Sequence, residues 1–192
     1  MKKILIGTHN NGKFKEISYL LSKKIKKISP KKLKIKSPKE TGKTFVANAR
    51  LKAKYFSSFS KLPVISDDSG LCIRALNGKP GIYSARWARR YGSFSNAMKN
   101  ILIKMKNKKD RSAVFVCSLS FKYPNKKTIS VLGKIKGSIS YNMLGNKGFG
   151  YDPIFIPHFK SITFGQMKKK EKINLDHRYV AFRNLKKKIK IL

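Results

Sequence analysis

Two adjacent carboxylates stand out in a chain that has few acids. Asp67 and Asp68 follow a short apolar run, in a sequence of 192 residues with 46 Lys plus Arg and only 8 Asp plus Glu. Neighbouring side chains of a continuing strand point to opposite faces, so both carboxylates reach one site only where a strand ends. Gly70, which follows Ser69, permits a turn at this point. We therefore expect the strand to end at the acidic pair.

This pair favours metal-assisted phosphate chemistry. Mg²⁺ is commonly bound by one or two carboxylates together with phosphate oxygens of a substrate, and a carboxylate can also orient or deprotonate a water. The pair alone is equally compatible with a turn in which an Asp side chain bonds to the backbone. Glu40 precedes a Thr-Gly turn and a predicted helix. Its simplest interpretation is a surface charge near a helix N-terminus.

A polar glycine loop near the start of the chain has the parts of a phosphate cradle. It consists of Thr8, His9, Asn10, Asn11, Gly12 and Lys13. The loop joins a predicted strand to a predicted helix, so backbone N–H groups and the helix N-terminus would face a bound anion. The spacing of a Walker loop is absent. An ordinary strand-to-helix turn is the alternative.

Two later segments carry aromatic and ionisable residues that could recognise a nucleotide. The first is the loop GFGYDP, with Phe149, Gly150, Tyr151 and Asp152. It could present a ring face to a base and a carboxylate or backbone edge for recognition, or it could be a turn with two buried rings. The second is Asp176-His177-Arg178. Cations are disfavoured at a helix N-terminus, so this His-Arg pair suggests a ligand with acceptor atoms.

The periodicity of the sequence predicts strands and helices that would position these residues. We expect strands over 2–8, one or two short ones within 23–39, a strand, turn and strand over 63–73, a hairpin of 113–121 with 128–139, and a short strand over 154–156. We expect helices from residue 13, over 45–56, over 95–105, and from Asp176, which would cap the last one. This mixture predicts an α/β fold with a mixed sheet. Residues 1–192 would form a single domain.

The composition excludes several classes of protein. At 41% hydrophobic and 11% aromatic, the chain can bury a core and is not expected to be disordered. No apolar run is long enough for a membrane span, and the first apolar stretch is too short for a signal peptide. Cys72 and Cys117 are expected to be buried thiols of a cytoplasmic protein. The charge of +38 suggests nucleic acid binding. The lysines are spread along the whole chain, however, which favours a composition bias and no specific nucleic acid partner.

Taken together, five segments resemble the Ham1/inosine triphosphatase family of nucleoside triphosphate pyrophosphatases. The resemblance runs from Ile4 to about Phe182. It rests on THNNGKFKEI, ETGKTFVANARLKA, PVISDDSGLCIRALNGKPGIYSARWA, GFGYDPIF and TFGQM…EK…HRYVAF. The family implies an elongated mixed β-sheet with flanking helices that form two lobes around a central cleft. It also implies a homodimer, and Mg²⁺-dependent hydrolysis of dITP, ITP and XTP to the monophosphate and pyrophosphate.

The resemblance also implies roles for individual residues. Residues 8–13 would hold the triphosphate, with Lys13 as the main cation, and Asn48 and Lys52 could also reach the phosphates. Asp68 would bind Mg²⁺ and accept a proton, with Asp67 as its support and Glu40 as a second metal ligand. The remaining expected contacts to the substrate are Ser69, residues 149–152, Lys172, and the base-recognising pair of His177 and Arg178.

The sequence departs from the family pattern at two places, and two other functions stay open. Asp176 stands where the family usually has serine, which could alter base preference, and His9 stands where a small residue is common. One alternative is a related pyrophosphatase for pyrimidine or other modified triphosphates. The other is a basic nucleic-acid-binding protein with an incidental nucleotide site.

Overall fold

The chain forms a mixed six-stranded sheet with helices against it, as the sequence predicts. The computed structural model describes residues 1–189. The strands are β1 (Lys3–Ile6), β2 (Lys26–Ile28), β3 (Val64–Ile73), β4 (Ser112–Lys122), β5 (Ile129–Ile139) and β6 (Phe155–Pro157). The α-helices are α1 (Asn11–Leu20), α2 (Phe45–Ser60), α3 (Ser84–Arg90), α4 (Phe94–Lys104), α5 (Lys169–Ile173) and α6 (His177–Lys188).

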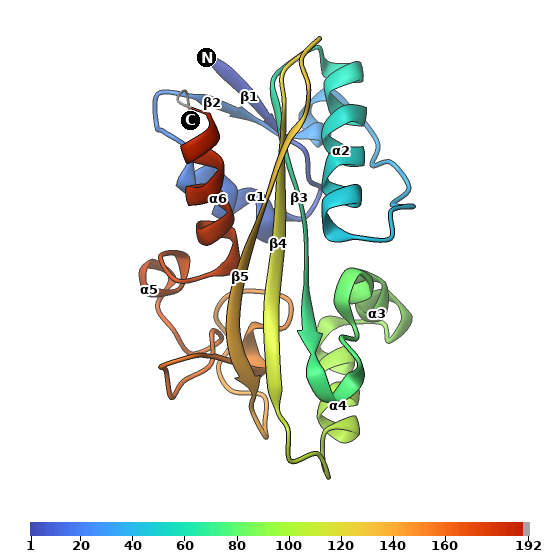
Figure 1. Ribbon diagram of the computed structural model, residues 1–192, viewed down its shortest axis with the longest axis vertical. Coiled ribbons are helices and arrows are strands. Elements are labelled where there is room, and N and C mark those ends of the chain that lie inside the picture. The colour runs from blue at the N-terminus through green and yellow to red at the C-terminus, as the bar shows by residue number, and fades with distance from the viewer. Residues whose placement is uncertain (190–192) are drawn as a thin grey trace. The chain divides into compact units, whose positions relative to one another are not determined.

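The sheet has the strand order β2-β1-β3-β4-β5-β6 (Figure 1). It is mixed because β1 pairs in parallel with both β2 and β3, whereas β6 pairs antiparallel with β5. The chain divides into two compact units. Within the described residues, the first comprises 1–68, 117–133 and 178–189, and the second comprises 69–116 and 134–177. The division falls within β3, β4 and β5, so each of these strands contributes to both units.

In the first unit, strand alternation sends neighbouring side chains to opposite faces of the sheet. Ile65 of β3 packs in a buried cluster with Ile17 of α1 and Leu185 of α6. Its neighbour Val64 packs instead with Phe56 of α2. The ribbon shows α1 and α6 on one side of these strands and α2 on the other (Figure 1). This period of two decides where each of the two acids further along β3 points.

The second unit has its own apolar core. Leu71 of β3 and Phe115 of β4 lie in a cluster with Met98 and Ile101 of α4. The rings of Phe115 and Phe155 have centroids 4.6 Å apart. The helix expected over 95–105 is therefore confirmed as α4, and it packs its apolar side chains inward. No helix among the 189 described residues is long and apolar enough to cross a membrane.

The expected turn in the middle of β3 is wrong. The strand runs without interruption from Val64 to Ile73. Gly70 serves a close contact and not a turn, because a Cβ there would lie 2.1 Å from the carbonyl oxygen of Gly81 and 2.5 Å from Oγ of Ser84. The acidic pair consequently lies inside a strand and not at its end.

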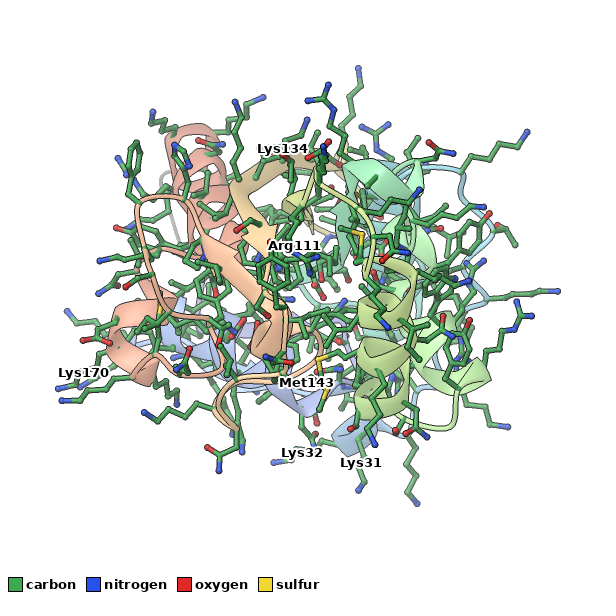
Figure 2. The ribbon with its side chains drawn as sticks, turned by 90° about the horizontal axis from the view of Figure 1, so that it is seen from below. Lys31, Lys32, Arg111, Lys134, Met143 and Lys170 are labelled. Atoms are coloured by element: carbon green, nitrogen blue, oxygen red, sulfur yellow. The ribbon has the colours of Figure 1, made fainter. Side chains whose placement is uncertain are left out.

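Other differences between the expected and observed elements are small. The segment of residues 23–39 holds one strand, β2, followed by a 3-10 helix over Pro30–Leu33. Helices α3 and α5 were not expected. Cys117 is buried as predicted, whereas Cys72 is only partly buried. Figure 2 shows Lys31, Lys32 and Lys170 extending outward from the ribbon, as expected for solvated charges.

Candidate active site

The polar loop after β1 forms the N-terminal cap of α1. The side-chain oxygen of Asn10 accepts a hydrogen bond from the backbone N–H of Lys13 at 3.0 Å, and Thr8 Oγ1 accepts one from the N–H of Asn10 at 3.2 Å. The N–H groups of Asn11 and Gly12 lie in the first turn, where no carbonyl within the helix can reach them. They are therefore available to an anion.

His9 lies at the edge of this loop. Its side chain is exposed, and Nδ1 is 2.6 Å from Oγ of Ser37. This contact ties the loop to the segment that follows the Pro30–Leu33 helix. A direct role of His9 in binding the substrate stays a prediction.

Asp67 is a fully buried carboxylate held by two cations. Its Oδ2 lies 3.1 Å from Nζ of Lys13 and 3.5 Å from Nε of Arg178. Burial alone would raise the pKa of Asp67, but Lys13, Arg178 and Lys52 outweigh it and hold the pKa at about 2. Asp67 is thus permanently ionised near neutral pH and is a poor proton acceptor.

Arg178 is anchored in the first unit by a residue that sequence reasoning left outside the site. Its Nη1 donates to Oε2 of Glu16 at 2.5 Å, and both side chains are buried. No local signal in the sequence predicts this pair, because its two residues are 162 positions apart. Arg178 therefore neutralises Asp67, and contact between Arg178 and a base stays a prediction.

Asp68 lies on the opposite face of β3 from Asp67. Its Oδ2 accepts a hydrogen bond from Nδ2 of Asn48 at 3.1 Å, and its Oδ1 lies 3.5 Å from Nζ of Lys52. Nζ of Lys52 also donates to Oε1 of Glu40 at 2.5 Å. The two predicted metal ligands are therefore brought together around one ammonium group.

The pKa of Asp68 is shifted the other way from that of Asp67. Burial raises it most, the positive charges of Lys52 and Lys13 oppose that effect, and the negative charges of Glu40 and Asp67 add to it, with a net increase. For Glu40, burial is opposed chiefly by Lys52, and the net pKa is lowered. Of the three acids, Asp68 is therefore the one best suited to accept a proton.

Helix α2 positions the group formed by Asp68, Glu40 and Lys52. Thr44 caps the helix by accepting a hydrogen bond from the N–H of Ala47 at 3.0 Å. Asn48 and Lys52 are four residues apart and so share one face of the helix. The Asn48 side chain uses its amide nitrogen on Asp68 and its oxygen on the N–H of Gly42, at 2.8 Å. It thereby fixes the loop that carries Glu40.

The early end of β1 allows groups from both faces of the sheet to meet. β1 ends at Ile6, opposite Ile65, whereas β3 continues through both acids. Ligands of parallel sheets bind outside the carboxyl ends of strands. Lys13 lowers the pKa of both Asp67 and Glu40 electrostatically, so the groups of the two faces share one region. That both acids act on one substrate stays a prediction.

The donor set fits a magnesium site that is completed by substrate oxygens. No group of three or more His, Cys, Asp or Glu side chains suited to a metal occurs among residues 1–189. The carboxylates of Asp68 and Glu40, however, both face Nζ of Lys52. Mg²⁺ typically needs only one or two carboxylates beside phosphate oxygens. These residues are compatible with the predicted metal, whose presence stays a prediction.

The predicted aromatic loop and Lys172 come together in the second unit. Oδ2 of Asp152 accepts hydrogen bonds from the N–H of Phe149 at 2.8 Å and from Nζ of Lys172 at 2.7 Å. Nζ of Lys172 also lies 4.8 Å from the centre of the Phe149 ring. The Phe149 ring is partly exposed, and the buried ion pair holds its loop in place.

Other predicted residues of the second unit have structural contacts. The Tyr151 hydroxyl donates to the carbonyl of Ser84 at 2.9 Å, so this ring is buried and is not a stacking surface. The His177 ring stacks on Phe115 with centroids 4.7 Å apart and planes 8° apart. Ser69 is partly exposed on β3. Roles for His177 and Ser69 in binding stay predictions.

Known proteins resemble the chain over nearly its whole length. The dITP/XTP pyrophosphatase of Caulobacter vibrioides is 41% identical over 186 residues, which cover 96% of each chain. The Ham1 protein of Staphylococcus aureus has a TM-score of 0.87 and 36% identity, with 98% of each chain covered. For the HAM1 protein of Coxiella burnetii the TM-score is 0.89 and the identity 31%, with both chains fully covered.

These likenesses agree with the sequence motifs and with the mixed sheet described above. A model of the Ham1 family matches residues 4–188, which include the polar loop, all three acids and the His177-Arg178 pair. The chain therefore belongs to the Ham1 family.

Proposed function

We propose that the chain hydrolyses deaminated purine nucleoside triphosphates, namely dITP, ITP and XTP, to the monophosphate and pyrophosphate. One observation carries this proposal. Beyond the end of β1, the N-terminus of α1 and Lys13 offer an anion site beside the carboxylates of Asp68 and Glu40. That combination suits a triphosphate that brings a divalent cation. The Caulobacter vibrioides relative is a dITP/XTP pyrophosphatase, which supports two of these three substrates.

In this mechanism, the reaction is an in-line displacement at the α-phosphorus. The water oxygen forms a bond to the α-phosphorus, the bond from that phosphorus to the bridging oxygen breaks, and pyrophosphate leaves. Lys13 and the N–H groups of Asn11 and Gly12 bind the departing phosphates. Catalysis consists mainly of positioning and charge neutralisation.

The two acids divide the work between them. Asp68, which lies beside Asn48 and Lys52, accepts the proton of the attacking water. Asp67, whose pKa is about 2, stays ionised and holds Lys13 in place. The structural reason is that Asp67 faces two cations, whereas Asp68 shares Lys52 with Glu40.

Asp68 and Glu40 would hold Mg²⁺. The chemistry that a bound Mg²⁺ supplies is neutralisation of charge on the phosphoryl oxygens. Asn48 contributes by fixing both Asp68 and the loop that carries Glu40. The assignment rests on the converging carboxylates and on the family resemblance.

Selectivity for the base would come from donors that face a 6-keto oxygen. His177 and Arg178 remain the predicted donors, and the partly exposed Phe149 ring would offer a stacking face. An adenine 6-amino group at such a site would leave a buried donor without its acceptor, at about 1–3 kcal/mol for each group. Clearing deaminated nucleotides from the precursor pool would be the cellular role, in the cytoplasm.

The deciding experiment measures turnover of dITP, XTP, dATP and dTTP with and without Mg²⁺, by wild type and by Asp68→Asn. We expect fast release of pyrophosphate from dITP and XTP that requires Mg²⁺. Asp68→Asn should lower kcat about 100-fold or more, since it removes a general base. Equal rates for dITP and dATP would contradict the selectivity, and full activity of Asp68→Asn would contradict the catalytic assignment.

Turnover and DNA-binding measurements on the same protein distinguish two other functions. Preference for dTTP would favour a pyrophosphatase of pyrimidine or modified nucleotides. A tight complex with duplex DNA that persists at high salt, without hydrolysis, would favour the nucleic-acid-binding protein suggested by the charge of +38. Purely electrostatic binding would instead weaken steeply as salt rises.

A further inference from the structure

We propose that Lys52 acts as the internal counter-ion of the Asp68–Glu40 pair and keeps a divalent cation from binding until a triphosphate arrives. The inference rests on the proposed function, because it concerns the same carboxylates. It goes further in predicting an order: the metal binds together with the nucleotide and not before it. The Lys52 ammonium group decides that order.

The position of the ammonium group carries the argument. Nζ of Lys52 lies 2.5 Å from Oε1 of Glu40 and 3.5 Å from Oδ1 of Asp68. A cation bound by both carboxylates would need the same space and the same oxygen atoms. Lys52 is held there from its own helix, where it is 8% exposed. Asn48, one turn earlier, fixes the other oxygen of Asp68.

The charge balance explains why a metal alone should bind weakly. Glu40 and Asp68 contribute two negative charges, and Lys52 already offsets one of them. A divalent cation added to this partly buried group would leave an excess of positive charge next to the Lys52 ammonium, whose side chain is only 10% exposed, and this repulsion is costly where water is partly excluded. A triphosphate supplies the missing negative charge, and Lys52 can then turn to its phosphate oxygens.

A purely structural role for Lys52 predicts something different. In that case Lys52 only stabilises α2 and the Glu40 loop, and its removal lowers stability equally with and without metal. The affinity for a metal ion, measured without nucleotide and therefore without turnover, separates the two roles of Lys52. Only the counter-ion role predicts that removing Lys52 raises this affinity.

The experiment titrates Mn²⁺ into nucleotide-free protein and follows the EPR signal of free Mn²⁺. Oxygen ligands that suit Mg²⁺ also suit Mn²⁺. We expect Lys52→Met to bind Mn²⁺ at least about tenfold more tightly than wild type, because one close positive charge is gone. The matched control Lys54→Met removes an exposed lysine from the same helix and should leave the affinity unchanged.

A measurement on wild type alone guards against a variant that fails to fold. A non-hydrolysable dITP analogue should raise the affinity of wild type for Mn²⁺ at least about tenfold. The Mn²⁺ that the analogue binds in solution without protein is measured separately and subtracted. The same analogue should have a smaller effect in Lys52→Met. Wild type that binds Mn²⁺ equally well with and without the analogue would overturn the inference, as would a folded Lys52→Met with unchanged affinity.

A further variant separates this inference from the proposed function. Asp68→Asn in the Lys52→Met background should abolish the tight Mn²⁺ binding, and its persistence would overturn the inference because the metal would lie elsewhere. The protein could show the expected Mn²⁺ binding and yet hydrolyse no deaminated purine nucleotide. That result would contradict the proposed function and leave the inference about Lys52 standing.

Discussion

At the scale of single residues, two chemically identical side chains have acquired different properties. Asp67 and Asp68 are neighbours on β3, so strand alternation gives them opposite faces of the sheet. Asp67 meets Lys13 and Arg178, whereas Asp68 meets Asn48 and Lys52. The first carboxylate is held ionised and the second is made more basic. The division of roles follows from the pleat of one strand.

The buried Asp67 should make stability depend on pH. Its pKa falls from an ordinary 3.8 to about 2 in the folded chain, which corresponds to about 2 kcal/mol of folding free energy. Because the folded pKa is depressed, this contribution is complete above about pH 4 and is lost as the pH falls towards 2. Asp67→Asn lacks it. We expect the difference in unfolding free energy between wild type and Asp67→Asn to shrink below pH 4.

Urea denaturation at a series of pH values between 7 and 3 measures this difference. The exposed Glu171 provides a control, because Glu171→Gln removes a carboxylate that is not buried. A gap between wild type and Asp67→Asn that does not change with pH would contradict the assignment of Asp67 as a carboxylate held ionised by its cations.

At the scale of elements, β3 shows that a glycine in the sequence can wrongly indicate a turn. Gly70 follows a polar serine, a pattern typical of a turn, and yet the strand continues through it. The deciding contact comes from Gly81, eleven residues later, and local sequence carries no information about that approach. The periodic elements, such as α4 with Met98 and Ile101 inward, were predictable because their signal is local.

Gly70→Ala tests the close approach directly. The added Cβ would lie 2.1 Å from the Gly81 carbonyl oxygen, which is backbone and cannot rotate away. We expect a loss of about 1–3 kcal/mol in unfolding free energy, typical of overpacking, seen as a lower melting temperature.

Gly78→Ala is the matched comparison for this substitution. Gly78 has a φ of +76°, and a Cβ there meets nothing within 4 Å. The unfolding free energy lost in Gly78→Ala should therefore reflect only backbone strain, about 1 kcal/mol. A smaller effect at Gly70 than at Gly78 would contradict the proposed role of the close contact.

A buried ion pair joins α1 and α6. Glu16 and Arg178 are 162 residues apart in sequence, and Glu16 lies outside every segment that the sequence marked as a site. The sequence indicates that each helix has an inner face, but not which polar residues of two distant helices meet. Lys13 and Asp67 were both marked as site residues, but their ion pair was missed for the same reason.

Glu16→Gln should weaken this junction. Removing one partner of a buried ion pair leaves the Arg178 guanidinium short of negative charge, and we expect a loss of about 3 kcal/mol in unfolding free energy. Urea denaturation measures the loss. Glu171→Gln is the control, because Glu171 is exposed and bonds only locally, to the N–H of Lys168 at 3.1 Å. Equal losses in the two variants would show that the buried pair contributes little.

At the scale of the whole molecule, the charge of +38 is the dominant property. Lysines such as Lys31, Lys32 and Lys170 extend outward from the ribbon (Figure 2). Five of the eight acids behave differently, since Glu16, Asp67, Asp68, Asp152 and Asp176 are buried. Most of the negative charges therefore lie in the interior, and the surface is left strongly positive. Such a surface attracts polyanions and repels a second copy of the chain.

This repulsion makes the predicted homodimer sensitive to salt. We expect dimers at about 150 mM NaCl, and a weaker association at about 10 mM, because the Debye length grows from about 8 to about 30 Å over that range. Sedimentation equilibrium at both salt concentrations measures the dissociation constant, and sucrose in place of salt controls for solvent exclusion. A monomer at every salt concentration would contradict the dimer. A dimer that weakens as salt rises would instead indicate an interface held by opposite charges, in which the few exposed acids have a larger part than their number suggests.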